Sequence, residues 1–352
     1  MTPRSKQAET DEVSAAFHEA LTQIGAKTTV EALSLWARVP VEARAATAGG
    51  WLRRAITLVM SRRRQSRDLA RAYYRLVRAL QTGRTVADPH HPEPEHVTLA
   101  DLRREFAELA GTYRPPAEMP PSDPPMDGDS GSSRSARPGE PVDEDDDWER
   151  ILVEELEGLR EEEERVERQA EEELRLVLES LGTTNLDRRL AAGDADPDDA
   201  HRQAGAQQAA AASRVAMNGG RSSTWTHMSR DRRALGYVRL SRSGTPCGWC
   251  AMLISRGPVY KSKRSTLFND GDKYHDNCHC YAMPIWNRDQ YQSSELTALS
   301  RQYEALWPEV TKGHTGKAAV TVWRRFIRAR QREAKQAAAQ EARRTTDTAP
   351  EA

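Results

Sequence analysis

Cys247-Gly-Trp-Cys250 and His275-Asp-Asn-Cys278-His279-Cys280 contain all four cysteines of a 352-residue chain. Cysteines paired in this way are typical of a local cross-link, which is either one metal ion or one or two disulfides. Cysteines that only fill a core would be scattered among apolar positions. We therefore expect a small cross-linked domain in the C-terminal half of the chain.

Five side chains in these segments are candidate metal ligands: Cys247, Cys250, His275, Cys278 and Cys280. Zinc binds cysteine sulfur at about 2.3 Å, and a tight turn at Cys247 to Cys250 can direct both sulfurs at one ion. In extended backbone His279 would face away from Cys278 and Cys280, so His275 is the better histidine ligand. Two zinc ligand sets stay open. Either all four cysteines bind the ion, or three of them bind it together with His275 and the fourth cysteine lies next to these ligands without binding the ion. Disulfides are the structural alternative.

Two enzymatic interpretations of the same residues have less support. A redox Cys-x-x-Cys needs a strand-to-helix context, and Ser243-Gly-Thr-Pro246 gives no buried parallel strand before Cys247. A papain-type nucleophile would use His275 as base with Asp276 beside it, although this histidine follows Cys250 by only 25 residues. The sequence has no motif of a zinc metalloprotease, an α/β-hydrolase or a P-loop enzyme. No catalytic residue is assigned.

The composition predicts a mainly α fold, with long charged helices beside the small α+β domain that the cysteines cross-link. Apolar residues make up 38% of the chain, charged residues 30% and aromatic residues 6%, and the mean hydropathy is -0.78. Little core can be buried by such a chain. No stretch approaches the ~18 apolar residues of a membrane span, so we expect no membrane partner. We also expect folding in a reducing cytosol, which favours thiolates and metal over disulfides.

The net charge of -1 hides two strongly charged blocks. Residues Trp51 to Arg84 contain ten arginines and the single acid Asp68, whereas residues 143 to 179 contain eighteen acids and five arginines. Such blocks bind partners or each other. The arginines are most simply explained as a solvated helix face, with nucleic-acid contact as the alternative.

The first half of the chain divides into three predicted parts. Residues 1–112 form an N-terminal helical domain, with breaks at Pro40 and at Gly49-Gly50 and a helix end at Gly83. Residues 113–147, rich in proline, serine and aspartate, form a flexible linker. Residues 148–199 contain a long acidic helix that could associate with itself, dock on a partner or fold back on the arginines. Its apolar stripe runs from Leu152 to Leu181, interrupted by Glu163 and Glu173.

The second half contains the predicted cysteine domain, residues 200–312, and a basic helix with a disordered tail, residues 313–352. A helix rich in small residues should end at the turn signal Asn218-Gly-Gly-Arg221. Short strands are predicted at Tyr237 to Leu240 and at Tyr281 to Trp286, on either side of the cysteines. The last helix should extend from about Gly316 to Arg343.

Two runs around the cysteines resemble the MuF-like minor head proteins of tailed bacteriophages, in particular the actinobacteriophage type. They are Cys247-Gly-Trp-Cys250-Ala-Met-Leu-Ile-Ser-Arg-Gly-Pro-Val-Tyr260 and Tyr274-His275-Asp-Asn-Cys278-His-Cys280. Asn218-Gly-Gly-Arg221 and Ala72-Tyr-Tyr-Arg75 are also similar to that group. The broader family pattern is His-Pro-x-Cys-Arg-Cys, whereas here Asp276 follows the histidine and His279 replaces the arginine.

The resemblance implies a structural minor capsid protein of a phage or prophage, acting in head morphogenesis. The partners it implies are the portal protein, the major capsid protein and scaffold proteins, with packaged DNA as a further partner. The location it implies is the virion, and the host cytoplasm during assembly. Related proteins are often labelled capsid maturation proteases, which is the first alternative function. A DNA-binding or injected virion protein is the second.

Overall fold

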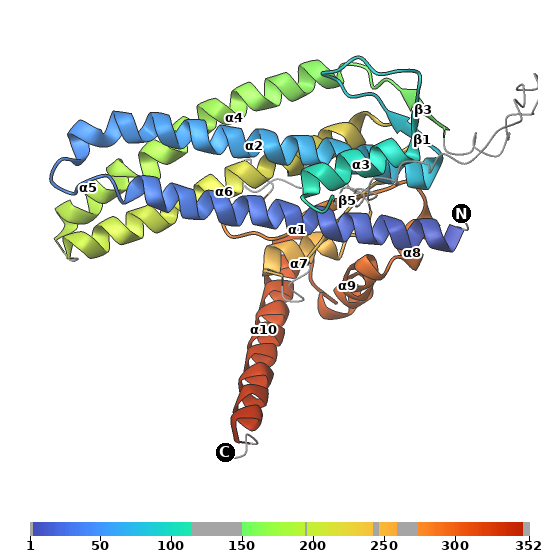
Figure 1. The fold of residues 1–352 in the computed structure, drawn as a ribbon. Helices are drawn as coiled ribbons and strands as arrows, with labels where there is room; N and C mark the ends of the chain where they lie inside the picture. Colours follow the sequence, from blue (N-terminus) through green and yellow to red (C-terminus); the bar gives the residue numbers. More distant parts are fainter. Residues whose placement is uncertain (1–2, 114–149, 194–195, 242–245, 259–273, 348–352) are drawn as a thin grey trace, which may run out of the picture.

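The computed structural model describes residues 3–113, 150–193, 196–241, 246–258 and 274–347 (Figure 1). These residues are mainly helical, with two small sheets, as the sequence predicts. The elements in chain order are α1 (Pro3–Trp36), α2 (Arg44–Thr82), β1 (Arg84–Val86), β2 (His96–Thr98), α3 (Leu99–Ala110), β3 (Arg150–Glu154), α4 (Leu159–Leu181), α5 (Thr183–Ala192), α6 (Pro197–Arg230), β4 (Gly236–Leu240), α7 (Gly248–Ile254), β5 (Tyr281–Ile285), α8 (Arg288–Ser293), the 3-10 helix η3 (Glu295–Thr297), α9 (Ala298–Val310) and α10 (Gly316–Asp347). Except for Tyr113, the predicted linker lies outside the described residues, and so does the tail from 348 onward.

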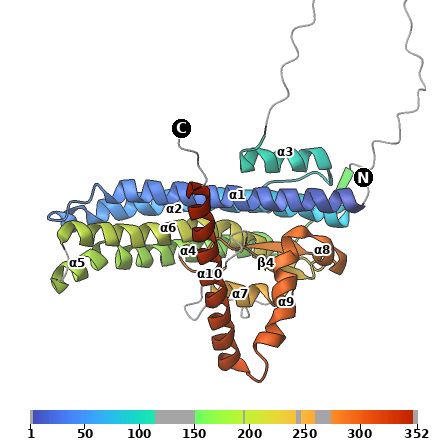
Figure 2. The same ribbon diagram turned by 90° about the horizontal axis from the view of Figure 1, so that it is seen from below.

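Four long helices, α1, α2, α4 and α6, lie side by side in an elongated bundle (Figures 1 and 2). At one end β3 pairs in parallel with β1 and antiparallel with β2, and α3 packs on α2. None of the helices in the described ranges is both long and apolar enough to cross a bilayer.

The predicted strands around the cysteines are confirmed as an antiparallel pair. Strand β4 pairs with β5 from Gly236 opposite Ile285 to Leu240 opposite Tyr281. One apolar cluster joins residues of this pair to α1, α2, α7 and α10. The cysteine region therefore rests on the bundle, and its position is fixed by residues far away in the sequence.

Two predicted helix breaks are wrong, because Gly49-Gly50 lies inside α2 and Asn218 to Arg221 lies inside α6. The α6 glycines serve close packing: a Cβ on Gly219 would lie 2.2 Å from the Arg63 carbonyl oxygen of α2. A Cβ on Gly220 would lie 2.6 Å from the Ser66 carbonyl oxygen. Packing of α6 in the bundle offsets the loss of helix stability of ~1 kcal/mol that each glycine causes. The breaks near Pro40 and at Gly83 are confirmed, and Gly83 has the left-handed φ of 71°.

The acidic helix starts later than predicted, because Leu152 lies in β3 and α4 begins at Leu159. Its end at Gly182 agrees with the prediction. Glu163, which interrupts the apolar stripe, is 3% exposed and accepts a hydrogen bond from the Ser223 hydroxyl of α6 at 2.8 Å. The apolar stripe of α4 thus contains one buried polar residue, which is hydrogen-bonded to α6.

The prediction of a solvated arginine face is wrong for four arginines of α2: Arg63, Arg71, Arg75 and Arg78. Arg63 Nε lies 3.0 Å from a Glu167 carboxylate oxygen of α4. Arg78 Nε lies 2.7 Å from Asp231 at the end of α6, and its Nη2 lies 2.6 Å from Glu154 of β3. The acidic helix therefore folds back in part on the arginines, as one of the alternatives predicted.

Candidate metal centre

The first half of the site is the start of α7. Cys247 is the N-cap residue of this helix, and its sulfur accepts a hydrogen bond from the Cys250 backbone N–H at 3.4 Å. One helical turn therefore brings both sulfurs to the same end of α7. Cys250 is buried and Cys247 is half-buried, so the pair lies at the edge of the core.

The second half is the segment that leads into β5. A turn with Asn277 at a left-handed φ of 59° closes with a hydrogen bond from Cys278 N–H to the His275 carbonyl oxygen, 3.1 Å. Beyond it the backbone extends, so Cys278 and Cys280 are buried while His279 between them is exposed. The expectation that His279 faces away from the other ligands is confirmed, and its carbonyl oxygen accepts a 2.7 Å hydrogen bond from His18 Nε2 of α1.

The two halves meet at Cys250. Its sulfur lies 3.6 Å from the Cys278 sulfur and 3.9 Å from His275 Nε2, and His275 Nε2 lies 3.0 Å from the Cys247 sulfur. The potential ligand atoms form two groups, each within 4.8 Å: Cys247, Cys250 and His275, and Cys250, Cys278 and Cys280. Zinc–ligand bonds of about 2.0–2.3 Å hold tetrahedral ligand atoms roughly 3.3–3.8 Å apart. The five predicted residues therefore form a cluster that could bind a metal such as zinc.

The cysteines are not joined in disulfides. All four are free, and the 3.6 Å between the sulfurs of Cys250 and Cys278 far exceeds the ~2.05 Å of a disulfide bond.

One protein family matches the part of the chain that contains this cluster. Residues 183–306 match the family described as VG15 protein. The match covers less than half of the chain but includes both halves of the site, from α5 to α9. No curated protein and no solved structure matches the chain.

Within the VG15-matching segment, the orientation of His275 suits a metal ligand. Its Nδ1 donates a hydrogen bond to the Asp276 carbonyl oxygen at 2.7 Å, which directs Nε2 at the sulfurs of Cys247 and Cys250. The Asp276 carboxylate instead lies 2.6 Å from Arg214 Nε of α6. The papain-type arrangement, in which Asp276 orients the histidine, is therefore absent at this site.

The groups of the cluster shift one another's protonation. Hydrogen bonds from Cys250 and from His275 lower the pKa of Cys247 to about 4. The same contact with Cys247 raises the pKa of His275 to about 9. Hydrogen bonds from Cys250 and Cys280, together with the charges of Arg221 and Arg239, lower the pKa of Cys278. These shifts favour the thiolate form, which binds metal, at Cys247 and Cys278, whereas contacts with neighbouring cysteines and burial raise the pKa of Cys250 and of Cys280.

Two buried arginines of the VG15-matching segment, Arg221 of α6 and Arg239 of β4, were not predicted as part of the site. They are 2% and 1% exposed, and their guanidinium carbons lie 4.2 and 4.0 Å from the centre of the Tyr274 ring. Arg221 Nη2 donates a 2.5 Å hydrogen bond to the Cys278 carbonyl oxygen. Burial alone would lower the pKa of Arg239, but nearby Tyr274 and the cysteines raise it. For Arg239 the one signal in the sequence was its place in the otherwise apolar run Tyr237-Val-Arg-Leu240, and Arg221 had no comparable signal.

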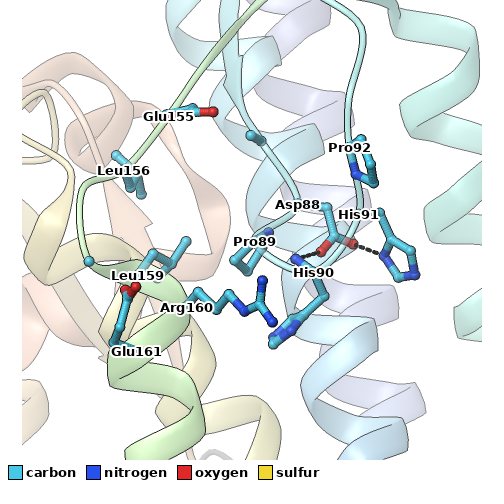
Figure 3. Close-up of a pocket in the computed structure, with 12 residues that line it drawn as sticks. Asp88, Pro89, His90, His91, Pro92, Glu155, Leu156, Leu159, Arg160 and Glu161 are labelled. Atoms are coloured by element: carbon cyan, nitrogen blue, oxygen red, sulfur yellow. Dashed lines mark hydrogen bonds and ion pairs between the residues drawn. The ribbon is translucent and has the colours of Figure 1, made fainter.

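A hollow of about 340 Å³ lies away from the cysteine cluster, between the β1–β2 connection and the start of α4 (Figure 3). Asp88 there accepts hydrogen bonds from the His90 backbone N–H and from His91, at 2.8 and 3.2 Å. None of the five predicted ligands lines it. Among the described residues, the only groups placed to hold a metal are the two that share Cys250.

Proposed function

We propose that this chain is a structural minor capsid protein of a tailed phage or prophage, which acts in head morphogenesis near the portal. In this proposal a zinc ion bound by the cysteine cluster fastens the C-terminal region to the helical bundle. The resemblance of the two cysteine runs to MuF-like proteins supports the proposal. Both runs lie inside the VG15-matching segment, although the description of that family states no function.

The observation that carries the zinc site in this proposal is the pair of buried arginines beside buried cysteines. A divalent ion has a net charge of minus two with four thiolates and of minus one with three thiolates and a neutral histidine, and in either case the buried charge needs a compensating partner. Arg221 and Arg239 supply two positive charges within reach of Cys278 and Cys280. An apolar core of reduced thiols would not require them.

Zinc would stabilise the fold by joining α7 to the segment before β5. Cys250 belongs to both possible groups of ligands, whereas His275 and Cys280 each belong to one. A structural zinc ion contributes on the order of 10 kcal/mol of binding free energy, which a chain with few apolar residues needs. The long helices of the bundle would then be free to contact partners in the assembling head.

The described residues give little support to the protease alternative. Ser223, His227 and Glu163 lie together, but they are 4%, 0% and 3% exposed. His227 Nδ1 faces the Ser223 hydroxyl, the Ser223 carbonyl oxygen and Glu163, at 3.4, 2.9 and 3.7 Å. A catalytic histidine would use one ring nitrogen for the serine and the other for the acid. This cluster is therefore better explained as a buried polar contact between α4 and α6.

The first test is the zinc content of the chain purified under reducing conditions, by elemental mass spectrometry. We expect one zinc per chain, lost in Cys250→Ser and kept in the matched control His279→Ala. His275→Gln then decides between the two ligand sets, because loss of the ion in this variant indicates the set that contains His275 and its retention indicates the set of four cysteines. Metal-free wild-type chain with an unchanged fold would contradict the zinc site.

The second test addresses the role in assembly. The chain is incubated with the major capsid precursor encoded in the same genome, and the mixture is analysed by gel electrophoresis and by sedimentation. A structural protein leaves the precursor at full length and co-sediments with assembled heads. Shortening of the precursor that persists in a Ser223→Ala control would point to a protease using other residues.

A further inference from the structure

Helix α10 carries a basic stripe on the side opposite to its buried residues. At one edge of the stripe Arg324 still contacts α7, since its guanidinium carbon lies 5.9 Å from the centre of the Trp249 ring. The helix leaves the molecule beside α7 and stands apart from the bundle (Figure 1). The contact is made by the buried residues Ala319, Trp323 and Ile327 and by a 2.9 Å hydrogen bond from Gln331 Nε2 to the Pro246 carbonyl oxygen. From Arg332 to Glu341 every residue is exposed. The outer half of α10 thus has solvent on all sides in the described structure.

Six exposed cations form the stripe: Lys317, Arg324, Arg325, Arg328, Arg332 and Lys335. At about 100° per residue they fall within an arc of roughly 100°, on the side opposite to Trp323, and they span roughly 27 Å of helix. The acids of the same stretch, Glu333 and Glu341, fall outside this arc. The stripe therefore presents positive charge alone.

The cations of the stripe form no ion pair with any residue that the structure describes, whereas the buried arginines of α2 are paired with acids. The arc also lacks large apolar side chains, since its other residues are Thr321, between the cations, and Ala339, one turn beyond Lys335. Protein interfaces usually depend on a few buried aromatic or aliphatic anchors. Binding to a phosphate backbone needs no such anchor, because counterion release supplies the free energy.

We propose that the basic stripe of α10 binds double-stranded DNA through its phosphates. An α-helix is about 10–12 Å in diameter and the major groove of B-DNA is about 12 Å wide, so the exposed side of α10 that carries the stripe can lie along the groove with its cations beside the phosphates. Arginine and lysine contacts to phosphate carry no sequence information, so binding is non-specific. This inference goes beyond the head-assembly role and does not depend on zinc or on any capsid partner.

The test measures fluorescence anisotropy of a labelled 20-base-pair duplex with the full-length chain as purified, between about 50 and 200 mM salt. The variant Arg325→Gln, Arg328→Gln, Arg332→Gln removes three cations of the stripe. The matched control Arg53→Gln, Arg54→Gln, Arg64→Gln removes three exposed arginines of α2. Far-ultraviolet circular dichroism checks that both variants remain helical.

We expect the stripe variant to bind at least about tenfold more weakly and to reduce the salt slope, log Kobs against log salt, by about two to three. The control should change both quantities much less. Equally weakened DNA binding in the two variants would mean that binding depends only on the net charge of the protein, and this would overturn the proposal. Absence of binding at 50 mM salt would also overturn it, as would equally tight, stripe-dependent binding to poly-glutamate, which would indicate an acidic protein surface instead.

Discussion

Helices α2 and α10 are both rich in arginine, yet their arginines have opposite surroundings. Four arginines of α2 are buried, and they bind carboxylates contributed by β3, α3, α4, α6 and the loops that follow β1. The stripe of α10 is exposed, and its cations form no ion pair with an acid of the described residues. The same residue type is thus a structural element in one helix and a candidate binding surface in the other. Local charge alone does not distinguish them.

The buried pair of α2 should show the largest effect. Arg78→Met leaves Asp231 buried without its main partner, since both side chains of the pair are 1% exposed. Breaking a buried ion pair by removing one partner typically costs about 3–5 kcal/mol. We expect a loss of that size in the free energy of unfolding, measured by urea denaturation. A loss under about 1 kcal/mol would mean that the pair is not buried in solution.

Close packing of α6 on α2 should give the second largest effect. In Gly219→Ala the new Cβ would meet the Arg63 carbonyl oxygen at 2.2 Å, and overpacking of this kind costs about 1–3 kcal/mol. The control Gly49→Ala meets only Arg53 Nη1, at 3.8 Å, and should stabilise by about 0.5–1 kcal/mol. If Gly219→Ala lowers the stability measured by thermal unfolding and Gly49→Ala raises it, only the α6 glycine is needed for contact with α2. A change of stability in the same direction in both variants would contradict this explanation.

Acid should weaken the α2 contacts before it affects the stripe. Burial alone would raise the pKa of Asp231, but hydrogen bonds and charge attraction from Arg78 hold it below the ordinary value of 3.8. A depressed pKa stabilises the fold above 3.8, and this contribution is lost as the pH falls through the folded pKa. The stability difference between wild type and Arg78→Met should therefore shrink below about pH 4. If the stability difference between the two proteins, measured by urea denaturation, stays constant down to pH 2.5, it does not come from the ionised Asp231 carboxylate.

The stripe itself should contribute least to stability. Arg328→Gln removes an exposed arginine that no described acid contacts, and such surface substitutions usually change stability by less than about 0.5 kcal/mol. We expect a thermal midpoint within about 1–2 °C of wild type together with weaker DNA binding. A large loss of stability would instead indicate that α10 packs on another part of the chain.

Much of the metal cluster could be predicted from the sequence. The spacing of Cys247, Cys250, Cys278 and Cys280 depends on backbone geometry over a few residues, and so do the exposure of His279 and the two flanking strands. The end of α2 at Gly83 and the existence of α10 follow from equally local signals. Turn geometry, strand alternation and helix propensity act between near neighbours, which is why these predictions succeed.

Only the tertiary structure decided which charges are paired and which glycines end a helix. Arg78 meets Asp231 across 153 positions of sequence, and Gly219 continues α6 because α2 lies against it. Arg221 and Arg239 reach the cysteines because α6 and β4 are packed beside the turn at Asn277. Such pairings depend on distances between segments that are remote in the chain. The sequence by itself determined the chemistry that this protein offers, and the packing of its helices decided where that chemistry is buried and where it is exposed.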